Sequence, residues 1–203
     1  MVYVMKESTA EYYLRRRVTL SEFLEITENT ETQYELIDGE IYFMASPCHA
    51  HQVAIREIFG QFYNFFKGKA CSPIMGLFDV RLKNNSPNFE DDPNIVQPDI
   101  LVICDSENID GKGKYHGVPT LVVEVLSPRT RGKYMIKKLS LYANSGVQEY
   151  WIIDIDHGYA IVYSLTDGDV LRVQQYAFSE CIPSWSFKGL NVETDLLIRS
   201  NKV

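Results

Sequence analysis

The sequence predicts one α/β domain with a mixed central sheet flanked by helices. Two runs, 95–104 (IVQPDILVIC) and 120–126 (TLVVEVL), are apolar on both alternating faces, as is typical of central strands covered on both sides. Apolar residues at three- and four-residue steps over residues 49–67 predict a long amphipathic helix. Because 203 residues suffice for one sizeable core, we expect a single domain over residues 1–203, with an N-terminal extension of about residues 1–17.

Two local signals predict the elements before the long helix. Thr19 followed three residues later by Glu22 matches a capping box, which predicts a helix over residues 19–27. Asp38-Gly39 accepts the positive φ values of a type I′ turn, so the β-rich runs 33–37 and 40–45 should pair as a hairpin.

The remaining elements follow from turn residues and periodicity. Loops are expected at 84–94 and 105–117, a helix at about 131–144, a hairpin of strands 149–155 and 159–165, and a further strand at 170–176. The loops flank the two apolar runs.

Composition and charge exclude several classes of protein. The net charge of −7 argues against a surface that attracts nucleic acid everywhere, so any such role needs a local basic patch. No apolar stretch has the length of a membrane span, and we expect a soluble, cytoplasmic protein. The scattered cysteines favour neither a zinc cluster nor a disulfide framework and are expected to be buried thiols: Cys48, Cys71, Cys104 and Cys181.

Two acids stand inside the apolar runs, Asp99 and Glu124. Burying an ionised carboxylate is costly unless a partner or a metal compensates. Two carboxylates on neighbouring strands can hold Mg²⁺ and leave positions for water and a phosphate oxygen, which suits phosphodiester hydrolysis. Two simpler interpretations remain open: Asp99 lies in a turn after Pro98, and Glu124 forms a structural ion pair.

A basic segment follows the strand that carries Glu124. Residues 111–138 contain seven basic side chains against this one acid: Lys112, Lys114, Arg129, Arg131, Lys133, Lys137 and Lys138. These charges can alternatively be solvated side chains at the start of a helix, without a role in binding. On the helix, Lys138 lies near the edge of the apolar stripe and can point toward Glu124, or extend to water, whereas Lys137 should reach solvent.

Several motifs resemble the Uma family of bacterial proteins. They are Pro98-Asp99, Glu124-Val-Leu-Ser-Pro, Lys138, Tyr142 and the stretch from Gly146 to Asp154 (GVQEYWIID). The resemblance extends to the first hairpin (YELIDGE, from Tyr34) and to Ser46-Pro47 with His51. It implies a restriction-endonuclease-like fold and the PD-(D/E)xK nuclease superfamily. In the last motif we expect Glu149, Tyr150, Trp151 and Asp154 to be structural.

The superfamily holds Mg²⁺ on two acids, matched here by Asp99 and Glu124, and uses a lysine to orient water. Leu126 occupies the usual place of that lysine, and the resemblance implies that Lys138 substitutes for it. Four residues before Lys138, Tyr134 stands where the family usually has Asp. Glu35 and His51 match further positions that could place a carboxylate and a base near the metal. The resemblance also implies a homodimer.

The leading hypothesis is therefore a Mg²⁺- or Mn²⁺-dependent endonuclease that hydrolyses DNA. Its metal ligands are Asp99 and Glu124, and its other catalytic candidates are Lys138, Glu35 and His51. One alternative is a non-catalytic nucleic-acid- or partner-binding protein on the same fold. Another is a metal-dependent phosphodiesterase that acts on RNA or small substrates.

Overall fold

The computed structural model describes residues 17–28, 30–44, 46–84, 86, 88–126, 133–195 and 197, with the side chains of 133 and 134 outside the description. The helices are α2 (Leu20–Glu28), α3 (His49–Phe66) and α4 (Lys133–Ser145). The first strands are β1 (Tyr34–Ile37), β2 (Glu40–Phe43), β3 (Ser72–Met75), β4 (Val80–Lys83), β5 (Pro93–Val96) and β6 (Ile100–Ile103). They are followed by β7 (Leu121–Val125), β8 (Glu149–Asp154), β9 (Tyr159–Thr166), β10 (Asp169–Ala177), β11 (Ile182–Pro183) and β12 (Asn191–Val192).

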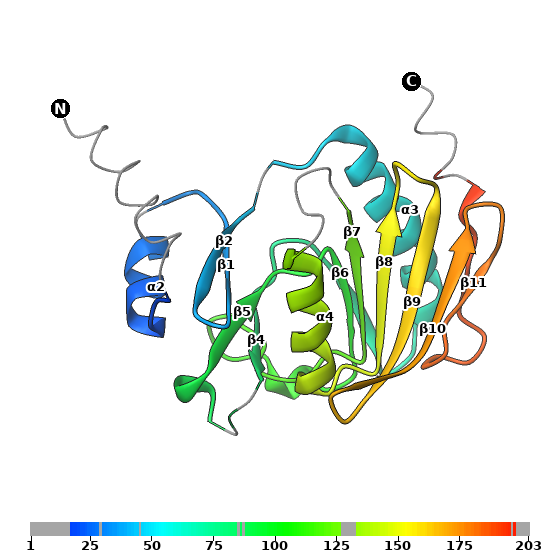
Figure 1. Ribbon diagram of the computed structural model, residues 1–203. Coiled ribbons are helices and arrows are strands. Elements are labelled where there is room, and N and C mark those ends of the chain that lie inside the picture. The colour runs from blue at the N-terminus through cyan, green and yellow to red at the C-terminus, as the bar shows by residue number, and fades with distance from the viewer. Residues whose placement is uncertain are drawn as a thin grey trace.

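The strands form two main sheets and one small hairpin (Figure 1). The larger sheet has the order β10-β9-β8-β7-β6-β3 and is mixed, because β7 and β8 run parallel while the other neighbours are antiparallel. The smaller sheet, β2-β1-β5-β4, is antiparallel throughout. The two expected central strands thus contribute β6 and β7, which lie inside the larger sheet.

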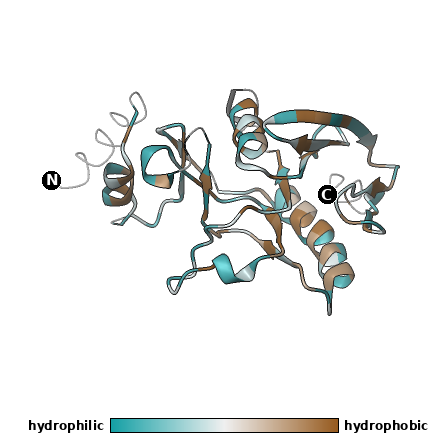
Figure 2. Cartoon of the chain, turned by 90° about the horizontal axis from the view of Figure 1, so that it is seen from below, coloured by the Kyte–Doolittle hydropathy of each residue, from teal (hydrophilic) through white to brown (hydrophobic). Residues whose placement is uncertain are grey.

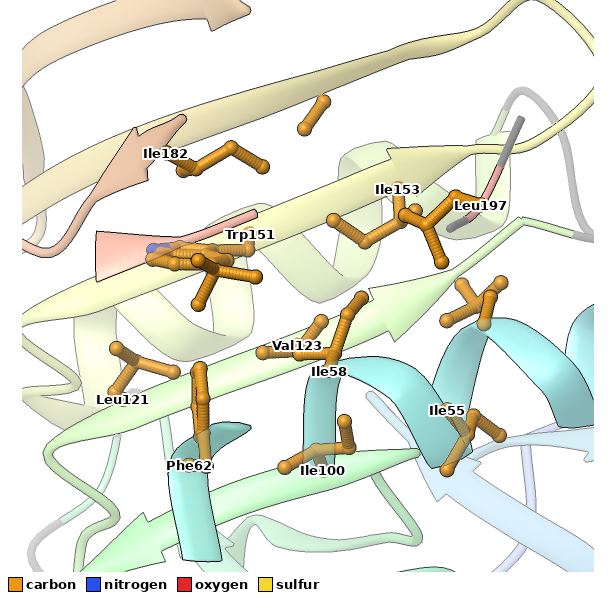
Figure 3. Packing of buried hydrophobic residues seen from close by; sticks show 14 of the residues in the cluster. Ile55, Ile58, Phe62, Ile100, Leu121, Val123, Trp151, Ile153, Ile182 and Leu197 are labelled. Atoms are coloured by element: carbon orange, nitrogen blue, oxygen red, sulfur yellow. The ribbon is translucent and has the colours of Figure 1, made fainter. Parts of the chain in front are cut away.

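Helices cover both faces of the larger sheet, and Figure 2 shows α3 and α4 on opposite sides of it. On one face, Ile55, Ile58 and Phe62 of α3 pack on the strands (Figure 3). On the other face, Met135, Leu141 and Tyr142 of α4 contact a second cluster. This double covering explains why β6 and β7 are apolar at every position but one.

Alternation along β7 decides where its acid points. Leu121, Val123 and Val125 belong to the cluster under α3, whereas Val122 belongs to the cluster under α4. Because side chains alternate between faces along a strand, Glu124 shares the face of Val122. The acid of β7 therefore faces α4, the helix that carries Lys138.

The local signals at the start of the chain are confirmed. The Thr19 N–H donates to Oε2 of Glu22 at 2.9 Å, and the Glu22 N–H donates to Oγ1 of Thr19 at 3.3 Å, which is a capping box at the start of α2. Asp38 and Gly39 have φ values of 52° and 72°, as a type I′ turn between β1 and β2 requires.

The prediction of one continuous strand over 95–104 is wrong. The run divides into β5 in the smaller sheet and β6 in the larger one, with residues 97–99 between them. Pro98 has no N–H to donate to a ladder, and the Gln97 N–H donates instead to Oε1 of Glu35 at 2.7 Å. The break places Asp99 at the crossing between the sheets.

The expectation of four buried thiols is also wrong. Cys71 and Cys104 form a disulfide, and Cys48 and Cys181 are exposed. The pairing of β3 with β6 places Ser72 opposite Ile103, so the next pair outward is Cys71 and Cys104, with Cα atoms 4.1 Å apart. Spacing in the sequence carries no sign of this register.

Candidate active site

A cleft of about 720 Å³ opens where the two sheets meet α3 and α4. Four residues selected from the sequence line it: His51, Asp99, Glu124 and Lys138. They come from the start of α3, the crossing between β5 and β6, the end of β7 and the middle of α4. The fold therefore brings together chemistry that is spread over 88 positions of the chain.

Lys138 is buried between two carboxylates, with 1% of its surface exposed. Its Nζ donates to Oε1 of Glu124 at 2.6 Å and to Oε1 of Glu35 at 3.0 Å. Glu35 itself is fully buried and holds the Gln97 backbone as well. Lys138 is therefore held by the fully buried Glu35 and at the same time contacts Glu124, which lines the cleft.

Glu124 has a second donor that the sequence did not indicate. The hydroxyl of Tyr142 donates to its Oε1 at 2.7 Å from the next turn of α4. The sequence pattern assigns Tyr142 to the apolar stripe of the helix and to the family motif, although its spacing of four residues from Lys138 puts both on one helical face. That spacing is the signal that could have found it.

Asp99 is oriented by α3 and by β7. The Val125 N–H donates to its Oδ2 at 2.8 Å, and Nε2 of His51 lies 3.4 Å from the same oxygen. His51 is 8% exposed, and its Nδ1 is buried without a hydrogen-bond partner among the described residues. Asp99 is thus more than a turn residue after Pro98, because two other elements hold its carboxylate.

The surroundings shift the protonation equilibria of three groups. Burial raises the pKa of Glu124 to about 7, an effect that Lys138 opposes and Asp99 increases. Burial lowers the pKa of His51, but the hydrogen bond and charge of Asp99 outweigh it, so the net pKa is raised. Burial also raises the pKa of Tyr142 well above its usual value, so its hydroxyl remains a donor.

The cleft suits a hard cation better than zinc. Among the described residues, no group of three or more His, Cys, Asp or Glu side chains is arranged as a metal site. Asp99 and Glu124 each use one oxygen for the contacts given above, and within the described residues the second oxygen has no hydrogen-bond donor. Mg²⁺ is commonly held by one or two carboxylates together with water and substrate phosphate, which this pair fits.

The predicted basic segment divides into paired lysines, the exposed Lys112, and residues outside the description. Lys114 contacts Asp79, and Lys137, expected to reach solvent, lies 2.8 Å from Oε2 of Glu40. Arg129, Arg131 and the side chains of Lys133 and Tyr134 lie outside the described residues. Two of the described lysines outside the site are therefore neutralised by acids.

A family model described as "Uma2: Putative restriction endonuclease" matches residues 20–194. The chain belongs to the Uma2 family. It is also similar to an uncharacterized protein of Synechocystis sp., with 27% identity over 184 residues, 90% of this chain and 92% of the relative. A crystal structure of a "putative nuclease belonging to DUF820" from Anabaena variabilis matches with a TM-score of 0.70 and 22% identity, covering 90% of this chain and 98% of that one.

These comparisons confirm the family resemblance and the restriction-endonuclease-like α/β fold predicted from the sequence. Membership of the Uma2 family supports a nuclease-like function and hence hydrolase activity. Within the described ranges, no helix is both long enough and apolar enough to cross a membrane. The cytoplasmic location and the homodimer stay predictions.

Proposed function

We propose that this Uma2 protein is a Mg²⁺- or Mn²⁺-dependent endonuclease that hydrolyses phosphodiester bonds of DNA. The observation that carries the proposal is the meeting of Asp99 and Glu124 in one cleft, with Lys138 2.6 Å from Glu124. Asp99 and Glu124 would hold the cation. When bound, it would lower the pKa of a water and polarise the phosphoryl group.

The protein's own groups have separate roles in this proposal. Lys138 places a buried positive charge beside the scissile phosphate, where it stabilises the charge that develops in the transition state. Glu35 positions that lysine from the buried side. His51 orients Asp99 through Nε2 and is the candidate to accept a proton from the attacking water.

The test is cleavage of plasmid and oligonucleotide DNA with Mg²⁺, Mn²⁺ or EDTA. We expect cleavage that EDTA abolishes, and a loss of about 1000-fold or more in Glu124→Gln and in Asp99→Asn. Glu107→Gln removes an exposed acid that does not line the cleft and serves as the matched control. Activity that survives in Glu124→Ala would overturn the assignment.

One observation favours a second candidate, a metal-dependent phosphodiesterase for RNA or small substrates. The chain carries a net charge of −7, and Lys114 and Lys137 are already paired with acids. The dependence of affinity on salt separates the two candidates, because long duplex DNA should bind with a steep salt dependence and a small substrate should not.

A further inference from the structure

Phe43, Met75 and Leu77 line one part of the cleft, which we call the apolar wall. These side chains are 55%, 52% and 72% exposed, yet they line the same cleft as Asp99 and Glu124. They are three of the nine large hydrophobic side chains that are exposed among the described residues. Exposed apolar surface that gathers beside the carboxylates of a cleft indicates a ligand with an apolar part.

Part of the apolar wall is joined by the backbone to the segment that carries Asp99. Leu77 follows Gly76 in the turn after β3, and the Gly76 N–H donates to the carbonyl of Asp99 at 3.0 Å. Leu77 has a φ of 40°, a left-handed conformation that is unfavourable for a leucine, and its exposed side chain gains no core packing in return. Phe43, at the end of β2, is held edge-on by Tyr34 with ring centroids 6.1 Å apart.

We infer that the apolar wall binds an unstacked nucleobase, so that the substrate carries unpaired nucleotides at the scissile phosphate. This inference rests on the proposed function. In a nucleotide whose phosphate reaches Asp99 and Glu124, the base is the flat apolar part, and an exposed aromatic ring is a stacking surface for any base. A volume of about 720 Å³ is in the range of small-ligand sites.

Charge favours unpaired over paired nucleic acid. A duplex turns its bases inward and presents phosphates, whose binding depends on many unpaired Lys and Arg side chains. This chain has a net charge of −7, and its described Lys114 and Lys137 are paired with acids. Stacking on the apolar wall supplies affinity that requires little positive charge. Exposed Gln52 also lines the cleft, where its amide can reach a base edge.

The test measures binding of oligonucleotides that carry 2-aminopurine, in EDTA and in Ca²⁺. The probes are a single strand, its duplex, and a duplex with a central unpaired bubble, each in deoxyribose and ribose form. We expect the single strand and the bubble to bind at least about tenfold more tightly than the duplex. Phe43→Ala and Leu77→Ala should each weaken that binding by about tenfold and change the 2-aminopurine fluorescence of the complex.

Two matched controls have the same chemistry and exposure away from the cleft. Leu171→Ala on β10 (70% exposed) matches Leu77→Ala, and Tyr63→Ala on α3 (54% exposed) matches Phe43→Ala. Both controls should change affinity by less than about twofold. Because all four side chains are exposed, urea midpoints should stay near that of the wild type, which separates binding from folding.

The outcomes separate this inference from the proposed function. If Glu124→Gln abolishes cleavage while Phe43→Ala and Leu77→Ala bind and cleave as the wild type does, the nuclease stands and the inference fails. If no nucleic acid is cut but a single strand binds in a Phe43-dependent way, binding of a base to the apolar wall stands, whereas hydrolysis and the scissile phosphate beside that base fail. Equal affinity for duplex and single strand also overturns the inference. The ribose and deoxyribose probes identify which nucleic acid supplies the base.

Discussion

Two buried carboxylates on adjacent parallel strands have opposite surroundings. Glu149, at the start of β8, is fully buried and accepts hydrogen bonds from four neutral donors: Nε1 of Trp151 at 2.6 Å, Oγ of Ser184 at 2.8 Å, and the N–H groups of Trp185 at 3.0 Å and Ser186 at 2.7 Å. Glu124, near the end of β7, is held by the charged Lys138 and by Tyr142, and it lines the cleft.

The difference shows that burial alone does not distinguish a candidate catalytic acid from a structural one. Neutral donors enclose Glu149, which ties the segment before β12 to the larger sheet and leaves the carboxylate no route to a ligand. Glu124 lines the cleft, accepts its described hydrogen bonds at Oε1, and shares a lysine with Glu35. The structural role expected for Glu149 and Trp151 agrees with these contacts.

The largest effect that would test this contrast is expected from Glu149→Ala. The change leaves four donors without an acceptor, and we expect the free energy of unfolding to fall by about 4–6 kcal/mol in urea denaturation followed by circular dichroism. Glu149→Gln keeps the shape and should cost less. Since Glu149 lies outside the cleft lining, cleavage per folded molecule should be unchanged, and a selective loss of cleavage would contradict the contrast.

Lys138→Met should have the next largest effect. It removes the cation that contacts the buried carboxylates of Glu35 and Glu124, which we expect to cost about 3–4 kcal/mol of unfolding free energy. Adding Glu35→Gln removes one of those charges and should recover part of the loss, so a double-mutant cycle should give a coupling of about 1–3 kcal/mol. Additive effects would show that the buried pair does not interact.

The stability of the metal-free protein should fall as pH rises. Burial raises the pKa of Glu124 from 4.5 to about 7, and a raised pKa in the folded state means that the folded state binds the proton more tightly. The stabilisation is present below pH 4.5 and is lost as pH rises through about 7, up to about 3 kcal/mol in total. His51, whose pKa is also raised, contributes in the same direction. Urea denaturation from pH 5 to 8 in EDTA measures the slope, and Glu124→Gln should remove most of it.

The smallest effects compare single donors at the two acids. Tyr142→Phe removes one donor to Glu124, and Ser184→Ala removes one donor to Glu149; each should cost about 1–2 kcal/mol. Only Tyr142→Phe should raise the pKa of Glu124 further, so that the loss of stability with rising pH occurs at a higher pH. If Ser184→Ala moved it equally, the two sites would be coupled.

Interactions between neighbouring residues were sufficient to predict several elements. The capping box at Thr19 and the turn at Asp38-Gly39 depend on contacts within four residues, so neighbouring residues alone specify them. The run around Ile95 could not be divided in the same way. Pro98 is a local sign of the break, but the assignment of the two halves to different sheets depends on Glu35, a residue of another strand, which accepts the Gln97 N–H.

The sequence by itself determined the acids Asp99 and Glu124, the helix that carries Lys138, and the family. Acids within apolar runs and helical spacing are visible without coordinates. Only the tertiary structure decided that Glu35 and Lys138 are buried against each other and that the Tyr142 hydroxyl donates to Glu124. It also decided that Phe43 and Leu77 line the cleft. These relations depend on how two sheets and two helices meet, and such long-range packing leaves no periodic signal in the chain.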